Sequence, residues 1–311
     1  MTPRVIFIVG PTATGKTALA AALAKELGSA VISADSMQIY RGMHIASAAP
    51  DESETQGVPH KLIEILPYGA TWTVADYAAA ARKEIDLLLS AGKTPVVAGG
   101  TGLYINALAD NIEFLPVKTD VSVRERLSAE YDRAGGEALL SRLKEIDREA
   151  AEKLDPADKR RIVRALEIYE TSGLTKTKQN EISRQSPAGF EPLMIGITFS
   201  DRQKLYDRIN GRVDIMLRKG LIEEARAAFA AGEAGGAAQA IGHKEFFGYF
   251  RGEKTLEEAA EELKRATRRY AKRQLTWFKR DSRIHWIQRD ITPDLLGEAK
   301  RIIESEGKDG A

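Results

Sequence analysis

The sequence predicts an α/β fold, in which a parallel sheet flanked by helices carries an all-helical insertion. Four short apolar runs, at residues 5–9, 30–34, 94–99 and 193–199, are typical of buried strands, and helix-forming segments lie between them. Between residues 115 and 190 the pattern is helical only. The 311 residues are 43% hydrophobic and 29% charged, which suits a soluble protein with a sizeable core.

The first apolar run leads into a glycine-rich loop with the GxxxxGKT spacing of a phosphate-binding P-loop. Its glycines let main-chain N–H groups turn inward around a phosphate, Lys16 adds a positive charge, and the Thr17 hydroxyl is a ligand for Mg²⁺. We therefore predict a P-loop NTPase-like core; the alternative is a glycine turn that merely joins a strand to a helix. The loop comprises Gly10, Pro11, Thr12, Ala13, Thr14, Gly15, Lys16 and Thr17.

The next helix and strand place a carboxylate near this loop. Residues 18–27 are strong helix formers, and the apolar run at 30–34 is followed directly by Asp35. Because ligands bind at the carboxyl ends of parallel strands, Asp35 should lie in the same crevice as Lys16 and Thr17. The alternative role for Asp35 is that of a helix N-cap.

A second glycine-rich turn is predicted further along the chain. Residues 41–70 contain many turn formers and are expected to form a loop, and residues 72–89 an amphipathic helix. The run at 94–99 then leads into a turn that opens a helix, so the Thr101 hydroxyl should face the same crevice. Two such turns imply a ligand with more than one phosphate. The absence of a terminal aspartate on this strand argues against a motor ATPase.

The helical insertion begins near Pro116 and ends in a Ser-Pro-Ala-Gly turn. We therefore expect a catalytic core of residues 1–114 and 191–311 and an insertion domain of residues 115–190. The insertion contains the basic sequence KRRIVR at 159–164, whose alternative interpretation is a solvated helix face.

Basic residues gather near the end of the core. Residues 201–230 are expected to form one long helix with Arg208 and Arg212 on one face, in reach of a diphosphate or else in surface ion pairs. Another helix should begin in the sequence AIGHKEF, and the last long helix covers residues 255–279. Its end, residues 264–280, has eight bases, three aromatic residues and no acid. The helix dipole explains part of this pattern, but not all of it, and nucleic-acid binding is favoured.

Composition excludes several kinds of site and compartment. The chain has no cysteine, so disulfides, thiolate metal sites and cysteine nucleophiles are excluded. Its four histidines lack the spacing of metal ligands. The first apolar run is too short to cross a membrane, so we expect a cytoplasmic protein without a membrane partner. We also expect a monomer.

From the residues alone, the P-loop and Asp35 indicate a diphosphate or triphosphate ligand with Mg²⁺. The basic, aromatic-interleaved segment indicates a polyanionic partner, although the net charge of the chain is only +1. Together they favour phosphoryl or diphosphate chemistry directed at nucleic acid. They do not identify the group that is transferred.

Successive motifs resemble those of the bacterial tRNA dimethylallyltransferase family, in order and spacing, over nearly the whole chain. The motifs DSMQIY and GGTGLY together are specific to that family and its relatives. Three positions depart from the pattern, since His44 and Ala49 stand where aspartate and lysine are usual, and His243 where tyrosine is frequent. The motifs are GPTATGKT (10–17), SADSMQIYRGM (33–43), PHKL (59–62), AGGTGLYI (98–105), KRRIVRALEIYETSG (159–173), LYDRINGRVDIMLRKGLIEE (205–224), AIGHKEF (240–246) and KRQLTW (272–277).

The resemblance implies transfer of a dimethylallyl group from dimethylallyl diphosphate to N6 of the adenosine immediately 3′ of the anticodon in tRNA, with release of diphosphate. The P-loop would hold the leaving diphosphate, with Mg²⁺ as cofactor bound by Thr17. Arg212 matches the family's catalytic arginine and, with Thr101, would assist at the same oxygens. Asp35 would orient the amine and accept its proton late, because a carboxylate with a pKa of about 4 cannot deprotonate a neutral aromatic amine.

The resemblance also implies contacts with tRNA. The insertion would grip the anticodon stem-loop, in which a base leaves its stack at small cost. The expected tRNA-binding residues are Asp35, Ser36, Met37, Gln38, Thr101, Arg124, Lys159, Arg160, Arg161, Ile162, Val163, Lys272 and Arg273.

Three other functions are weighed against this one. An adenylate isopentenyltransferase modifies free AMP, ADP or ATP and needs no large insertion, so residues 115–190 argue against it. A P-loop small-molecule kinase would instead transfer phosphate from ATP. A non-catalytic RNA-binding protein would keep the pocket only as a relic, which the complete set Lys16, Thr17, Asp35, Thr101 and Arg212 argues against.

Overall fold

A computed structural model describes residues 2–114, 120–186, 188–232, 237 and 240–308. The chain divides into two compact units, each of which is described by itself. The core unit consists of Met1–Ala109 and Ala188–Ala311, and the insertion unit of Asp110–Pro187. No helix in the described part of the chain has an apolar stretch long enough to span a bilayer.

The core unit is built on one fully parallel sheet of six strands in the order β3-β2-β4-β1-β5-β6, which confirms the predicted α/β fold. Central strands of such a sheet are covered on both faces, which explains why β1 and β5 have long apolar runs. The strands are β1 Arg4–Val9, β2 Val31–Ser33, β3 His60–Lys61, β4 Val96–Gly99, β5 Glu191–Thr198 and β6 Ile284–Gln288.

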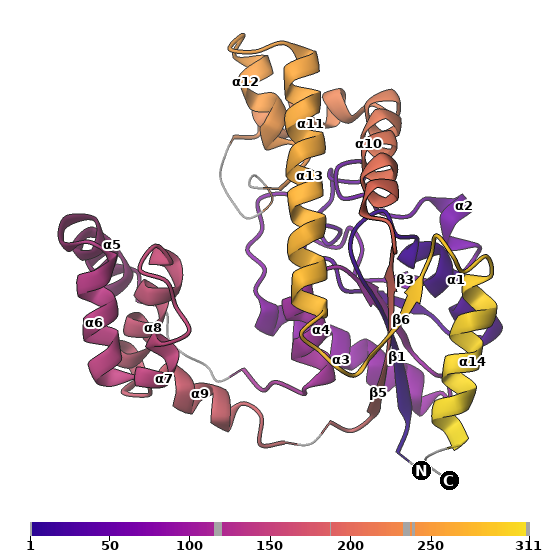
Figure 1. Ribbon diagram of the computed structural model, residues 1–311, viewed down its shortest axis with the longest axis horizontal. Helices are drawn as coiled ribbons and strands as arrows, with labels where there is room; N and C mark the ends of the chain where they lie inside the picture. The colour runs from indigo at the N-terminus through magenta and orange to yellow at the C-terminus, as the bar shows by residue number, and fades with distance from the viewer. Residues whose placement is uncertain (1, 115–119, 187, 233–236, 238–239, 309–311) are drawn as a thin grey trace. The chain divides into compact units, whose positions relative to one another are not determined.

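Helices cover both faces of this sheet. Figure 1 shows α1 and α14 on one face and α3 and α4 on the other. Leu19 and Leu23 of α1 pack against Ile8 of β1 and Ile195 of β5 in one buried cluster. The helices of the core unit are α1 Lys16–Glu26, α2 Glu52–Thr55, α3 Val74–Ser90, α4 Gly102–Ala109, α10 Arg202–Arg218, α11 Leu221–Ala230, the 3₁₀ turn η2 Lys244–Phe246, α12 Phe247–Phe250, α13 Leu256–Phe278 and α14 Leu295–Lys308.

The register of the sheet brings three strand ends to one edge. Val9 at the end of β1 pairs with Gly99 at the end of β4, and Ser33 at the end of β2 pairs with Ala98. The segments that follow these strands therefore leave the sheet side by side. They are the P-loop, the turn that begins at Asp35, and the turn that contains Thr101.

Several predicted helices are confirmed close to their expected ends. α3 and α13 both begin at capping boxes, in which Thr73 and Thr255 accept N–H groups of Asp76 and Glu258. α13 ends at Phe278, where the sequence predicted its end within one residue. Its acidic first turn suits the helix dipole, as expected, but its last turn contains no basic residue, so the dipole does not account for the bases near its end.

Other predictions for the core unit were wrong in detail. The single helix expected at 201–230 is broken at Gly220, which adopts φ 100° and separates α10 from α11. The expected loop at 41–70 includes α2 and the two-residue strand β3. AIGHKEF forms a turn and η2, and α12 begins only at Phe247. The edge strand β6 was not predicted.

The insertion unit is entirely helical in its described part. Its own apolar core includes Leu127, Leu143, Ile162 and Leu166. Helix α5 ends at the C-cap Gly135 and helix α8 at the C-cap Gly173. The helices are α5 Val121–Ala134, α6 Gly136–Ile146, α7 Arg148–Ala151, α8 Lys159–Ser172 and α9 Lys176–Ile182.

The close approach of β2 and β4 yields a prediction about stability. A Cβ atom on Gly99 would lie 2.1 Å from Ala34 O, so Gly99→Ala must separate the strand ends. We expect it to lower the free energy of unfolding by about 1–3 kcal/mol, measured by urea denaturation followed by circular dichroism. In the control, Gly69→Ala, the added methyl meets no described atom within 4 Å. Equal midpoints for the two variants would contradict the prediction.

Candidate active site

The backbone of the P-loop depends on glycine at two positions. Gly10 and Gly15 have φ values of 134° and 94°, which glycine alone adopts readily. A Cβ atom on Gly10 would lie 2.3 Å from Ile197 O, so β5 approaches this point too closely for a side chain. α1 starts at Lys16 without a side-chain cap from Gly15, and its first N–H groups are therefore available to an anion.

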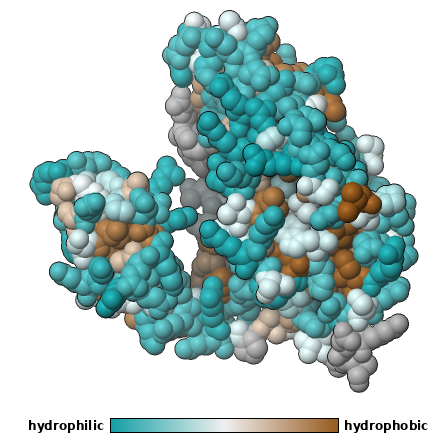
Figure 2. Space-filling view, in the orientation of Figure 1, coloured by the Kyte–Doolittle hydropathy of each residue, from teal (hydrophilic) through white to brown (hydrophobic). Residues whose placement is uncertain are grey.

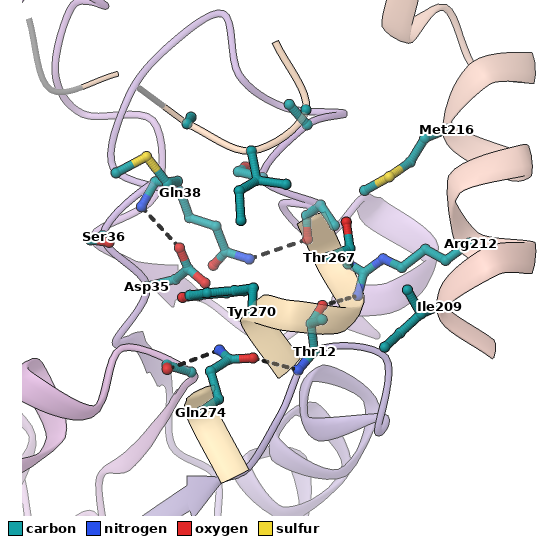
Figure 3. Close-up of a pocket in the computed structure, with 18 of the residues that line it drawn as sticks. Thr12, Asp35, Ser36, Gln38, Ile209, Arg212, Met216, Thr267, Tyr270 and Gln274 are labelled. Atoms are coloured by element: carbon teal, nitrogen blue, oxygen red, sulfur yellow. Dashed lines mark hydrogen bonds between the residues drawn. The ribbon is translucent and has the colours of Figure 1, made fainter. Parts of the chain in front are cut away.

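Two cavities meet at the P-loop. The first cavity, of about 340 Å³, and the second cavity, of about 380 Å³, share Lys16, Thr17, Ala48, Arg212 and Met216 in their walls. Figure 3 shows how the first cavity is enclosed, with Asp35, Tyr270 and Gln274 facing Arg212, Ile209 and Met216. The second cavity is rich in bases, namely Lys16, Arg208, Arg212, Lys219 and Arg289.

Lys16 lies at the junction of the two cavities. Burial, assisted by the positive charge of Arg212 and opposed by Asp35, lowers the pKa of Lys16 from 10.5 to about 7. Its Nζ donates to Pro11 O at 2.7 Å. An anion in the loop would favour the ammonium form and reverse the shift in pKa.

Asp35 follows β2 and lines the first cavity. Burial raises the pKa of Asp35, although the Met37 N–H and the positive charge of Lys16 oppose this shift. Met37 N donates to Asp35 Oδ1 at 2.9 Å, and residues 36–39 form turns, so the alternative role as a helix cap is wrong. A raised pKa makes the carboxylate a stronger base.

Thr101 does not belong to the wall of either cavity but lies behind the first one. Its Oγ1 accepts the N–H of Ser36 at 3.0 Å, which joins the turn after β4 to the turn after β2. Its hydroxyl is also hydrogen-bonded to Tyr270, whose phenol pKa is raised by burial and by Asp35. Thr101 therefore positions the segments around Asp35. Ser36, Met37 and Gln38, also expected to contact tRNA, line the first cavity beside it.

α10 directs two guanidinium groups at the P-loop. Arg212 Nη1 donates to Thr12 Oγ1 at 3.1 Å, and Arg208 Nε donates to Ala13 O at 3.0 Å. The two residues lie on one face of the helix, as their spacing predicted. Both side chains point to the loop, in contrast to the alternative of surface ion pairs.

The sequence reasoning missed several residues of the site. Gln274 accepts the Thr12 N–H at 2.9 Å and donates to Gly100 O at 2.9 Å, which ties α13 to both glycine-rich turns. Tyr270, one turn earlier, lines the first cavity. The only sequence signal was the i, i+4 spacing of two polar side chains on a face that is otherwise buried.

Of the basic pair proposed on α13, Arg273 lines the first cavity, with its guanidinium 5.7 Å from the centre of the Tyr270 ring. Lys272 is exposed and does not line that cavity. The surface of α13 is mostly hydrophilic on the face drawn in Figure 2.

Some of the expected RNA-binding residues of the insertion unit are exposed and others are buried. Arg160 and Arg161 are exposed, whereas Ile162 and Val163 are buried in the apolar core of the unit. Their side chains therefore hold α8 in place, and any RNA contact at these two positions falls to the neighbouring bases. Lys159 pairs with Asp132 at 2.6 Å, and Arg124 with the buried Glu167 at 3.0 Å.

Thr17 is the residue that could hold Mg²⁺. It lines both cavities, whereas the described residues contain no group of three His, Asp or Glu side chains that could bind a metal alone. A single hydroxyl fits a Mg²⁺ ion whose other ligands are phosphate oxygens and water, the usual arrangement for this ion. His44 and Ala49, which depart from the family pattern, line the second cavity.

The lowered pKa of Lys16 predicts proton uptake on anion binding. At pH 8 most Lys16 side chains are neutral in the free protein, and bound diphosphate should restore the ammonium ion. The number of protons taken up on binding can be measured by titration calorimetry with Mg²⁺-free inorganic diphosphate, in buffers of different ionisation enthalpy. The wild type should take up most of one proton more than Lys16→Arg does. The arginine is already charged at this pH. Equal proton uptake by the two proteins would contradict the prediction.

The sequence is similar to known transferases along most of its length. A family model described as IPP transferase matches residues 38–281, and one described as Isopentenyl transferase matches residues 3–64. The chain is 47% identical over 288 residues to the tRNA dimethylallyltransferase of Acetivibrio thermocellus, covering 92% of both chains. It is 42% identical over 298 residues to that of Bacillus subtilis, covering 96% of this chain and 94% of the relative.

Solved structures of the same kind of transferase are also similar to this chain. The tRNA isopentenylpyrophosphate transferase of Bacillus halodurans aligns with a TM-score of 0.70 and 40% identity, over 100% of this chain and 96% of that one. A eukaryotic dimethylallyltransferase, solved acting on tRNA, aligns with a TM-score of 0.78 and 26% identity, over 92% of this chain and 74% of that one. The chain belongs to the IPP transferase family.

Proposed function

We propose that the protein transfers a dimethylallyl group from dimethylallyl diphosphate to N6 of the adenosine immediately 3′ of the anticodon in tRNA. One observation carries this proposal: Asp35, Lys16 and Arg212 line a single cavity, which joins a second, basic cavity at the P-loop. An acceptor base at Asp35 and a diphosphate at Lys16 can therefore lie next to each other, one in each cavity. The names of the relatives support the same reaction.

The P-loop side of the site would stabilise the leaving group. As the bond between C1 of the prenyl group and the diphosphate oxygen breaks, its electron pair passes to the diphosphate. Lys16, Arg212 and the first N–H groups of α1 surround that position, so cations and donors are at hand as the charge grows. Mg²⁺ bound to the diphosphate and to Thr17 would supply further neutralisation of this charge.

The carboxylate side would handle the acceptor amine. N6 attacks C1 of the prenyl group and becomes positively charged as the new bond forms, and Asp35 then accepts the surplus proton. Before that step the Asp35 carboxylate would hold the amine by a hydrogen bond, while Met37 N and Thr101 fix the surrounding turns. Burial raises the pKa of Asp35, which favours this transfer.

The first cavity also has an apolar part that suits a five-carbon chain. Ile209, Val213 and Met216 of α10 and Leu263 of α13 line it. This surface is continuous with Arg212, so the prenyl group can lie on apolar side chains while its diphosphate contacts the cations. The pocket needs no polar partner for the alkyl chain.

The RNA contacts are proposed for exposed bases on two elements. Arg273 on α13 lines the first cavity and its neighbour Lys272 is exposed, and Arg160 and Arg161 on the insertion unit are exposed. Cations in such positions contact backbone phosphates. A tRNA substrate would be met in the cytoplasm, by a protein that we still expect to be monomeric.

The reaction is tested with dimethylallyl diphosphate labelled in the prenyl group and tRNA that lacks the modification. Nucleoside analysis should find the label on N6 of the adenosine 3′ of the anticodon. Label on free AMP or ATP, with none on tRNA, would instead indicate an adenylate isopentenyltransferase. Transfer of phosphate from ATP without any prenyl transfer would indicate a kinase.

The role of Asp35 predicts a selective loss of chemistry. Asp35→Asn keeps the shape of the side chain, and Asp35→Ala removes it; both lose the proton acceptor. Each should lower the single-turnover rate about 10²–10⁴-fold at saturating substrates, with tRNA affinity close to that of the wild type. A single-turnover rate equal to wild type would exclude Asp35 as the base.

The exposed bases on α13 predict a change in salt dependence. Lys272→Gln and Arg273→Gln should each reduce the slope of log affinity for tRNA against log salt concentration by about one. Filter binding over a range of salt concentrations measures this slope. The control is Lys93→Gln, an exposed lysine that precedes β4 at the opposite edge of the sheet. Slopes that match this control would indicate a structural role for the two residues.

A further inference from the structure

Two chain segments distant in sequence form part of the cavity walls. The 44–49 loop contributes residues 46–48 to the first cavity and residues 44, 45, 48 and 49 to the second. The 240–244 turn contributes four residues to the first cavity. The 44–49 loop contains no helix or strand, and the 240–244 turn reaches only the first residue of η2, so other contacts must fix where these walls lie.

One carboxylate on α11 holds both segments. Glu224 Oε2 accepts the N–H of Ile45 at 2.8 Å, and Glu224 Oε1 accepts the N–H of Ala46 at 2.9 Å. The same Oε1 lies 2.9 Å from His243 Nε2, in the centre of the 240–244 turn. Burial alone would raise the pKa of Glu224, but these hydrogen bonds lower it, so the side chain is a carboxylate.

The imidazole of His243 donates a hydrogen bond to Glu224 through Nε2. Its side chain is fully buried, and its Nδ1 has no hydrogen-bond partner among the described residues. A carboxylate can only accept, so Nε2 must carry the hydrogen that Glu224 receives. The contact with Glu224 is therefore the only hydrogen bond that the ring makes within the described residues.

The two segments also touch each other directly. Gly242 has φ 114°, and a Cβ atom at this position would lie 2.8 Å from Ala46 Cβ. The turn and the loop are therefore packed as closely as a glycine permits. At the other end of the loop, Gln38 Nε2 donates to Ala48 O at 3.2 Å.

We propose that Glu224 and His243 are positioning residues that set the affinity of the site for dimethylallyl diphosphate. Neither lines a cavity, but together they fix the 44–49 loop and the 240–244 turn against the P-loop side of the site. This inference rests on the proposed function. The walls contact the donor alike in the ground state and the transition state, so loosening them raises KM for the donor with little change in kcat.

A matched pair of variants tests the hydrogen bond from His243. Glutamine places an N–H near the position of Nε2, and methionine has similar length without a donor. His243→Met should raise KM for dimethylallyl diphosphate about tenfold, with KM for tRNA and kcat within about twofold of wild type. His243→Gln should stay close to wild type. Similar behaviour of the two variants, or a parallel fall in all parameters, would overturn the proposal.

A second variant covers the case in which His243→Met does not fold. Glu224→Asp keeps the charge but withdraws the carboxylate from Ile45 and Ala46, and it should show the same selective rise in KM. The control is Glu223→Gln, whose side chain is exposed on the same helix. A Glu224→Asp protein that is folded by circular dichroism and has the wild-type KM for the donor would overturn the proposal.

Direct binding separates this proposal from the proposed function. Calorimetric titration of the wild type with dimethylallyl diphosphate, without RNA, should give binding that weakens about tenfold in His243→Met. Absence of prenyl transfer to tRNA by the wild type would contradict the proposed function itself. Binding of equal strength by wild type, His243→Met and Glu224→Asp would leave that function standing and overturn only the positioning role.

Discussion

Burial of like charges around one P-loop is the constraint on which the rest of the site depends. Lys16 and Arg212 line the same cavity, where Asp35 offsets the charge of both and Glu54 also offsets that of Arg212. The pKa of Lys16 is lowered to about 7 and that of Asp35 is raised, so each side chain loses part of its preference for the charged form. A bound diphosphate would reverse the first shift. The site is thus arranged for an anionic group that forms part of the substrate.

A polar network keeps these charges in place without neutralising them. Gln274 joins the P-loop to the turn after β4, and Thr101 joins that turn to the turn after Asp35. All are neutral donors and acceptors, which fix geometry and leave the net charge unchanged. α13 thus provides a buried polar face at the site through Gln274 and Tyr270, and an exposed basic face through Lys272.

The sequence allowed prediction of those site residues that follow directly from a strand end or a motif. Lys16 and Asp35 follow strands, and parallel strands deliver their ends to one edge, so short-range patterns were sufficient. Gln274, Arg289 and the Glu224–His243 pair could not be found this way, because their partners lie far away in sequence and depend on helix packing. β6 was missed because five residues of mixed polarity carry little periodicity.

The sequence KRRIVR illustrates why residue type alone did not determine a role. The sequence allowed two interpretations, a solvated helix face and an RNA contact. They are compatible, because the residues that α8 adds to the apolar core lie on one side of the helix. Ile162 and Val163 fill the core of the insertion unit, which obliges their basic neighbours to face solvent. Arg161 is paired with Asp158 at 3.3 Å, a surface ion pair worth about 0–1 kcal/mol. So weak a pairing can be exchanged for a phosphate, and we therefore propose that the solvated face is also the face that meets RNA.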